Sequence, residues 1–203
     1  RRVLLGENKV CGLTREQDAQ AAYEAGAIYG GLIFVESSPR AVNEEQARKV
    51  MAAAPLNYVG VFRDADINDV AAKADALSLS AVQLHGDEDQ AYIDALRHAL
   101  APQVQIWKAQ SVGATLPARN LKHVDKYVLD NGQGGTGQRF DWSLLRGEVL
   151  DNVLLAGGLS PDNCVEAAKT GCAGLDFNSG VESQPGIKDA SKLASVFKTL
   201  RAY

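Results

Sequence analysis

The chain has 203 residues, 46% of them hydrophobic and 23% charged, and its formal net charge at pH 7 is −4. That length suits one compact domain with a sizeable core. The negative net charge and the lack of a Lys/Arg cluster argue against a nucleic-acid-binding protein, and the lack of a long apolar run argues against a membrane protein.

Residues 1–7, "RRVLLGE", are interpreted as an N-terminal joining segment. The first residue is Arg rather than Met, so we expect the chain to be a segment of a longer polypeptide. The three cysteines have no spacing typical of a disulfide framework or a zinc site, and they fit a reducing compartment. We therefore expect a cytoplasmic protein.

Short apolar runs recur along residues 8–203, each followed by a polar turn and a helical pattern. Their carboxyl ends lie 21 to 28 residues apart, about the length of one strand, one loop and one helix. Runs this apolar suit a parallel sheet covered on both faces. Eight such units predict a single (β/α)8 TIM barrel, with an open doubly wound sheet as the alternative. The eight strands are expected to end near Cys11, Phe34, Phe62, His85, Lys108, Asp130, Gly157 and Asn178.

The helices expected between these strands differ in the strength of their end signals. Thr14 and Asn43 are predicted N-caps of the first two helices, and Pro161 is predicted at the first position of the seventh, behind Ser160. The final helix is expected over 189–203. The fifth and sixth, over 111–124 and 140–145, are expected to be short or irregular because the first contains a proline and the second is barely a turn and a half.

Glycine-rich turns after the seventh and eighth strands predict a phosphate site. In barrels of this type the carboxyl ends of the strands build the active site, and the last two loops frequently hold phosphate. Backbone N–H groups exposed by glycine, near a helix N-terminus, bind anions. The alternative is that these glycines only make tight turns. The predicted phosphate-binding residues are Gly157, Gly158, Ser179 and Gly180.

The segment 131–138, "NGQGGTGQ", follows the sixth strand and matches the glycine pattern of a dinucleotide site. Such a site needs an immediate helix and an acidic residue at the end of the next strand, and that strand ends instead in "LAGG". We interpret the segment as a flap over the site, and we expect neither a cofactor nor a metal.

Asp130 ends the sixth strand just before this segment and is a candidate general acid. Arg40 follows Pro39 and is either a solvated surface side chain or a guanidinium that holds a substrate carboxylate. His85 is placed in the wall of the site without an assigned role. Cys164 and Cys172 are interpreted as small buried hydrophobic residues.

Lys9 and Asp176 are expected to face inward on neighbouring strands where the barrel closes, because each lies two residues before a strand end. We predict an ion pair between them. An ammonium near Cys11 favours thiolate, so we also expect the pKa of the Cys11 thiol to be lowered from about 8.5.

Several of these motifs together resemble phosphoribosylanthranilate isomerase. The resemblance runs in order from Asn8 to the end of the chain, through "KVCGLT", "SPR", "VQLHG", "VLDNGQGGTG", "LAGGL" and "SGVES". The nearest likeness is to the isomerase domain of bifunctional proteins that also carry indole-glycerol-phosphate synthase. Asn178 departs from the pattern, because many members of the family have Ser there.

The resemblance implies a cofactor-free Amadori rearrangement of a small phosphorylated substrate in tryptophan biosynthesis. It implies Asp130 as the general acid, Cys11 as the general base and Arg40 as the group that binds the anthranilate carboxylate. It also implies fusion to a synthase domain, and we expect a monomer. The alternatives are another phosphosugar isomerase, such as that of histidine biosynthesis, and an inactive phosphate-binding barrel.

Overall fold

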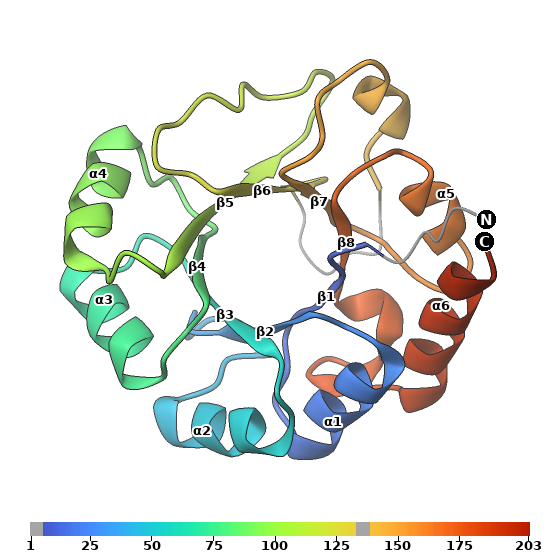
Figure 1. Cartoon of the computed structure of the whole chain (residues 1–203), viewed down its shortest axis with the longest axis horizontal. Helices are drawn as coiled ribbons and strands as arrows, with labels where there is room; N and C mark the ends of the chain where they lie inside the picture. Colours follow the sequence, from blue (N-terminus) through green and yellow to red (C-terminus); the bar gives the residue numbers. More distant parts are fainter. Residues whose placement is uncertain (1–5, 133–138) are drawn as a thin grey trace.

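Eight parallel strands close into a barrel in the order β1 to β8, with β8 pairing with β1 (Figure 1). The computed structural model describes residues 6–132 and 139–203. The predicted barrel is confirmed, and the open sheet is wrong. The strands are β1 (Lys9–Val10), β2 (Tyr29–Ile33), β3 (Asn57–Phe62), β4 (Ala81–Leu84), β5 (Gln105–Ser111), β6 (Lys126–Asp130), β7 (Val153–Leu155) and β8 (Gly174–Phe177).

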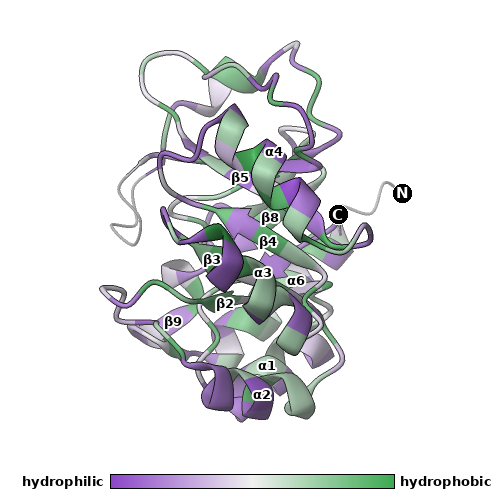
Figure 2. Cartoon of the chain, turned by 90° about the vertical axis from the view of Figure 1, so that its left-hand side faces the viewer, coloured by the Kyte–Doolittle hydropathy of each residue, from purple (hydrophilic) through white to green (hydrophobic). Residues whose placement is uncertain are grey.

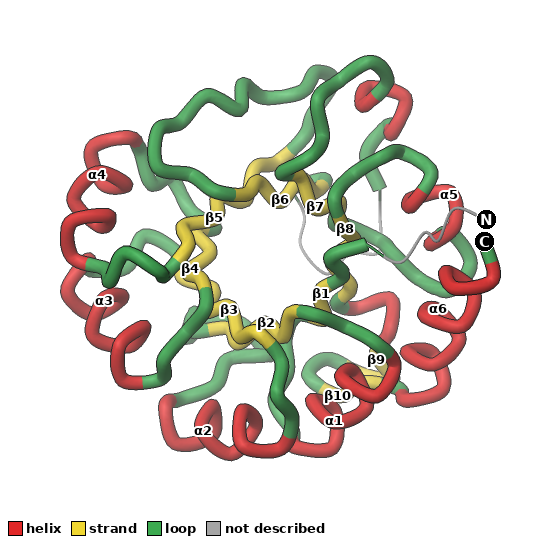
Figure 3. The backbone as a smooth tube through the Cα atoms, viewed as in Figure 1, coloured by secondary structure: helices red, strands yellow, loops and turns green. Residues whose placement is uncertain are grey.

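Helices surround this barrel (Figure 3). An antiparallel pair, β9 (Glu182–Gln184) with β10 (Ile187–Lys188), follows β8 and was not predicted. Within the part of the chain that the structure describes, no helix is long and apolar enough to cross a membrane. The helices are α1 (Glu16–Ala25), α2 (Glu44–Ala53), α3 (Ile67–Ala76), α4 (Gln90–Ala99), α5 (Cys164–Ala168) and α6 (Ala190–Ala202), with short 3-10 helices η1 (Trp142–Leu145) and η2 (Ser179–Val181).

Strand alternation separates two packed regions. Outward residues such as Val82 and Leu129 pack against the helices, whereas inward residues such as Val59, Trp107 and Val128 form a separate cluster inside the barrel. Helices α2, α3 and α4 carry both hydrophilic and hydrophobic residues, as helices with one buried face do (Figure 2). Side chains fill the interior of the barrel, so the space for a site lies at the mouth, at the carboxyl ends of the strands.

Two predicted helix starts are wrong. The Thr14 hydroxyl donates to the Gly186 carbonyl of the β9–β10 turn instead of capping α1, whose N-cap is Arg15. At α5, a turn in which Asn163 Oδ1 accepts from the Ser160 N–H delays the helix until Cys164. The Asn43 cap is confirmed. The irregular connection expected over 111–124 contains no helix, and the one over 140–145 contains only η1.

Candidate active site

The carboxyl ends of β1, β4, β6, β7 and β8 surround a cavity of about 110 Å³ at the barrel mouth. Of the glycine-rich segment 131–138, residues 133–138 lie outside the described residues, so the flap stays a prediction. The cavity brings together seven of the eight predicted site residues: Cys11, His85, Asp130, Gly157, Gly158, Ser179 and Gly180.

Cys11 follows β1 and is buried in the cavity wall. Its N–H donates to the Phe177 carbonyl at 2.8 Å, which extends the β1–β8 pairing up to the site. A Cβ added to Gly31 on β2 would come within 2.7 Å of the Cys11 Sγ, so the absence of a side chain there leaves space for the thiol.

Lys9 and Asp176 form the predicted ion pair across the seam where the barrel closes. They are register partners on β1 and β8, and the Lys9 Nζ lies 2.8 Å from the Asp176 Oδ2. Lys9 Nζ also donates to Gln83 Oε1 at 3.0 Å. Burial alone would lower the pKa of Lys9, but the charges of Asp176 and Cys11 outweigh burial and raise it. Lys9 is therefore a buried ammonium beneath Cys11.

Charged side chains act on the Cys11 thiol in opposite directions. The ammonium groups of Lys9 and Lys188 favour the thiolate, whereas the Asp176 carboxylate disfavours it. Burial nevertheless dominates: it raises the pKa of the Cys11 thiol, although Lys9 and Lys188 oppose the rise. The predicted lowering of this pKa is therefore wrong in direction.

Asp130 ends β6 and lines the same cavity as Cys11. Its Oδ1 accepts the Gly132 N–H at 2.7 Å, and its Oδ2 lies 3.6 Å from the His85 Nε2. Burial lowers the pKa of His85, even though the Asp130 charge opposes the shift. A neutral imidazole thus stands beside the candidate acid, and this contact gives His85 a place in the site.

The β7 and β8 loops touch each other through their backbones. A Cβ on Gly180 would come within 1.7 Å of the Leu159 carbonyl oxygen, so only glycine fits. Gly157 and Gly158 have φ of 91° and 68°, in the region that favours glycine, and their N–H groups donate to no atom of the described residues. Helix α5 has only five residues and begins at Cys164, so its N-terminus contributes little to anion binding. The candidate anion site therefore depends on the N–H groups of the two glycines.

Arg40 lies in an adjoining cavity of about 270 Å³, which Arg63 also lines. Glu182 binds one edge of the Arg40 guanidinium: Nη2 lies 2.6 Å from Oε1, and Nε lies 3.0 Å from Oε2. Lys188 Nζ donates to the same carboxylate at 3.1 Å. The two cavities share four lining residues, Ile33, Val61, His85 and Asn178.

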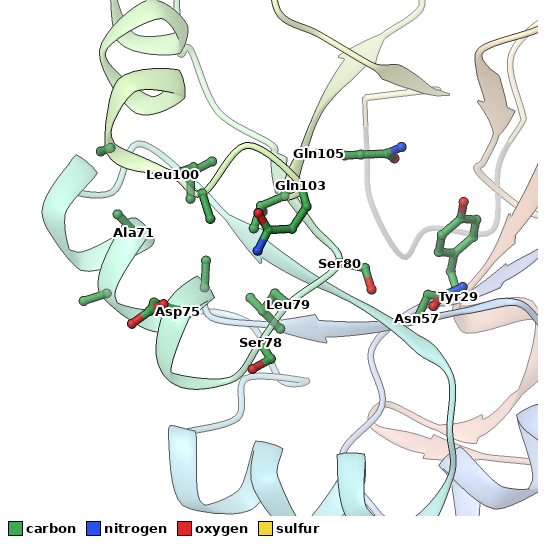
Figure 4. Close-up of a pocket in the computed structure, with 15 residues that line it drawn as sticks. Tyr29, Asn57, Ala71, Asp75, Ser78, Leu79, Ser80, Leu100, Gln103 and Gln105 are labelled. Atoms are coloured by element: carbon green, nitrogen blue, oxygen red, sulfur yellow. The ribbon is translucent and has the colours of Figure 1, made fainter.

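A larger cavity, of about 790 Å³, opens at the opposite end of the barrel (Figure 4). It is lined by Tyr29, Asn57 and Gln105, each of which begins a strand, and by residues of α3 and of the loop after α4. In barrel enzymes the chemistry takes place at the carboxyl ends of the strands, so size does not make this cavity the active site.

Sequence reasoning missed several residues that shape the site. Glu182 and Lys188 belong to the unpredicted β9–β10 pair, and no local pattern connects them to Arg40. Asn163 fixes the β7 loop by donating from Nδ2 to the Gly158 carbonyl at 2.8 Å. Gln83 could have been found by strand alternation, because it lies on β4 two residues before His85, which follows the strand.

The closed barrel and its polar mouth place the protein in the class of (β/α)8-barrel enzymes. Residues 8–199 match the family described as N-(5'phosphoribosyl)anthranilate (PRA) isomerase. The chain is 76% identical over its whole length to the tryptophan biosynthesis protein TrpCF of Salmonella typhi, but it spans only 45% of that protein. The chain belongs to the phosphoribosylanthranilate isomerase family, a family of isomerases.

Solved structures agree with this assignment. The phosphoribosyl anthranilate isomerase of Thermus thermophilus superimposes with a TM-score of 0.84 at 32% identity, covering 97% of this chain and 98% of that one. An isomerase in complex with reduced 1-(o-carboxyphenylamino)-1-deoxyribulose 5-phosphate has a TM-score of 0.80 at 29% identity, covering 98% and 100%. The family resemblance stated from the motifs is confirmed.

Proposed function

We propose that Cys11 and Asp130 are the base and the acid of an Amadori rearrangement. The reaction converts N-(5-phosphoribosyl)anthranilate to 1-(2-carboxyphenylamino)-1-deoxyribulose 5-phosphate. One observation carries the proposal: both side chains line a single small cavity whose remaining wall includes the two glycine loops suited to phosphate.

In this mechanism Asp130 protonates the ring oxygen, and the furanose opens to an iminium at C1. Cys11, as thiolate, then removes the proton from C2, which the adjacent iminium has made acidic. The resulting enolamine tautomerises to the ketone. The positive charge of the iminium also favours the thiolate electrostatically, which offsets part of the burial that disfavours it in the free protein. Paired proton transfers of this kind contribute about 10² to 10⁴-fold per group.

The substrate's two anionic ends are assigned to the two adjoining cavities. The phosphate binds to the backbone N–H groups of Gly157, Gly158, Ser179 and Gly180, and the anthranilate carboxylate binds to Arg40. Glu182 holds one edge of the guanidinium, which orients Arg40 and leaves its Nη1 for the substrate.

The test follows the loss of phosphoribosylanthranilate fluorescence on addition of the protein. We expect Cys11→Ala and Asp130→Asn each to lower kcat about 10²- to 10⁴-fold. Cys164→Ala is the matched control, because that thiol is also buried but lies in α5, outside the cavity. Full activity in both site variants would overturn the assignment, and no turnover by the parent chain would indicate an inactive barrel.

The setting of this activity is also a proposal. In the TrpCF relatives the matching segment is under half of the protein. We propose that residues 8–203 act as the isomerase domain of such a fusion, which residues 1–7 join to an indole-glycerol-phosphate synthase domain. We further propose that the domain is monomeric and works in the cytoplasm, where its three free cysteines stay reduced.

A further inference from the structure

Asp176 is a second carboxylate in the cavity that holds Cys11 and Asp130. It lies on β8 as the register partner of Lys9 on β1, and Lys9 precedes Cys11 by two residues. Its side chain keeps 7% of its surface exposed, whereas its partner Lys9 keeps none. The carboxylate therefore belongs both to the barrel floor and to the site.

The hydrogen bonding of this carboxylate is incomplete. An ionised carboxyl offers about four acceptor positions. Among the described residues, Lys9 Nζ is bonded to Oδ2, and Oδ1 is buried without a partner. A buried acceptor left without a donor is unfavourable, so the arrangement is suited to a ligand that supplies one.

The same contacts fix which kind of ligand group fits. Lys9 is fully buried, and its further contacts, Gln83 Oε1 and the Cys11 sulfur, can also accept hydrogen bonds. The Lys9 ammonium therefore keeps its proton beside Asp176. Asp176 is then an acceptor and not a donor. A sugar hydroxyl can donate to it, whereas a phosphate or a carboxylate would be repelled.

We propose that Asp176 accepts a hydrogen bond from the substrate's C2 hydroxyl, the hydroxyl on the carbon that Cys11 deprotonates. This inference rests on the proposed function, which brings C2 to Cys11. With the C2 oxygen held by Asp176 from below, the C2–H bond is turned toward the Cys11 sulfur. Asp176 thus makes tight binding depend on a hydroxyl at C2, and it positions the reacting carbon.

Titration calorimetry with two non-reacting ligands tests this contact. The first is reduced 1-(o-carboxyphenylamino)-1-deoxyribulose 5-phosphate, whose C2 carries a hydroxyl, and the second is its 2-deoxy counterpart. We expect the parent protein to prefer the hydroxylated ligand by about 10- to 100-fold. Asp176→Asn keeps only a neutral acceptor, so we expect the preference to fall several-fold.

A second variant replaces the whole ion pair. Lys9→Met combined with Asp176→Leu replaces both buried charges with apolar side chains of similar volume. Proteins tolerate such a replacement better than the loss of one partner alone. We expect this variant to bind the two ligands with affinities within about 2-fold of each other. Asp94→Asn, on the exposed face of α4, is the matched control and retains the preference of the parent.

The outcomes separate this role from a purely structural one. If Asp176 served only as the counter-ion of Lys9, the variants would weaken both ligands equally and keep the preference, which overturns the proposal. A parent that binds both ligands equally overturns it without any variant. Failure of the parent to bind either ligand would instead contradict the proposed function.

Discussion

Glu182 binds Arg40 at the rim of the barrel mouth, above β1, although 142 positions separate the two residues in the chain. Both side chains are almost fully buried, and Lys188 completes the cluster from β10. The cluster sets the orientation of the one guanidinium that the proposed function uses. Its consequences can be measured in binding and in stability.

Replacement of Arg40 by Lys keeps the charge but removes the planar fork. A lysine cannot contact Glu182 and a substrate carboxylate together in fixed geometry, so the substrate should bind more weakly. We expect the KM for phosphoribosylanthranilate to rise about 10- to 100-fold, with a smaller change in kcat. Steady-state kinetics measures both constants. Arg48→Lys, in an exposed pair on α2, is the control, and an unchanged KM in Arg40→Lys would remove Arg40 from the site.

The Glu182 carboxylate is expected to make the fold sensitive to acid. Burial alone would raise the pKa of Glu182, but Arg40 and Lys188 outweigh burial and lower it. Because the pKa of Glu182 is lower in the folded protein than in the unfolded chain, its carboxylate stabilises the fold at pH values above the unfolded-state pKa of about 4.3. This stability is lost as the pH falls through the lower, folded-state pKa.

We therefore expect Glu182→Gln to be less stable than the parent at pH 7, by about 3 kcal/mol, because two buried cations lose their partner. Its stability should also fall less steeply than that of the parent as the pH is lowered below about 4.3. Urea denaturation across this pH range measures both effects. Glu45→Gln, on the exposed face of α2, serves as control. Parallel pH curves for the parent and Glu182→Gln would contradict the coupling.

Substitution of Gly180 tests the contact between the two glycine loops. An alanine Cβ would meet the Leu159 carbonyl at 1.7 Å, so the β7 and β8 backbones must separate. We expect Gly180→Ala to raise the KM at least 100-fold and to abolish protection of the protein against thermal unfolding by inorganic phosphate. Gly113→Ala is the matched control, because a Cβ there meets nothing within 4 Å. Retained phosphate protection in Gly180→Ala would place the anion site elsewhere.

The parts of this structure that the sequence predicts are those that depend on local periodicity. The eight strands recur at regular spacing, and alternation within a strand places Lys9 opposite Asp176 once the barrel is assumed to close. The same alternation places Val128 inside the barrel and Asp130 at its mouth. These predictions need no knowledge of distant contacts.

The parts that the sequence does not predict depend on long-range contacts and on burial. Thr14 has a good capping pattern, yet its hydroxyl is taken by the Gly186 carbonyl, 172 positions away. Glu182 carries no local sign that its partner is Arg40. The direction of the Cys11 pKa shift is set by a balance between burial and nearby cations, and only the structure gives the extent of burial.

The Cys11 thiol itself provides the last prediction. Its pKa is raised above the ordinary value by burial, and Lys9 limits the rise. Loss of the Lys9 ammonium in Lys9→Met should therefore raise the pKa of Cys11 further, so that less thiolate is present at any given pH. Each unit of increase lowers the thiolate fraction at neutral pH about tenfold, and kcat/KM should fall in proportion.

The pH dependence of alkylation by a small reagent, in a Cys164→Ala/Cys172→Ala background, reports the titration of Cys11 directly. We expect a midpoint above about 8.5 in the parent and a higher one in Lys9→Met. Lys49→Met, which removes an exposed ammonium on α2, should leave the midpoint unchanged. Circular dichroism is needed to check that Lys9→Met is folded, because the change leaves Asp176 without its partner. A midpoint that stays in place or moves to lower pH would show that Lys9 does not act on the thiol, and its buried charge would then serve Asp176 alone.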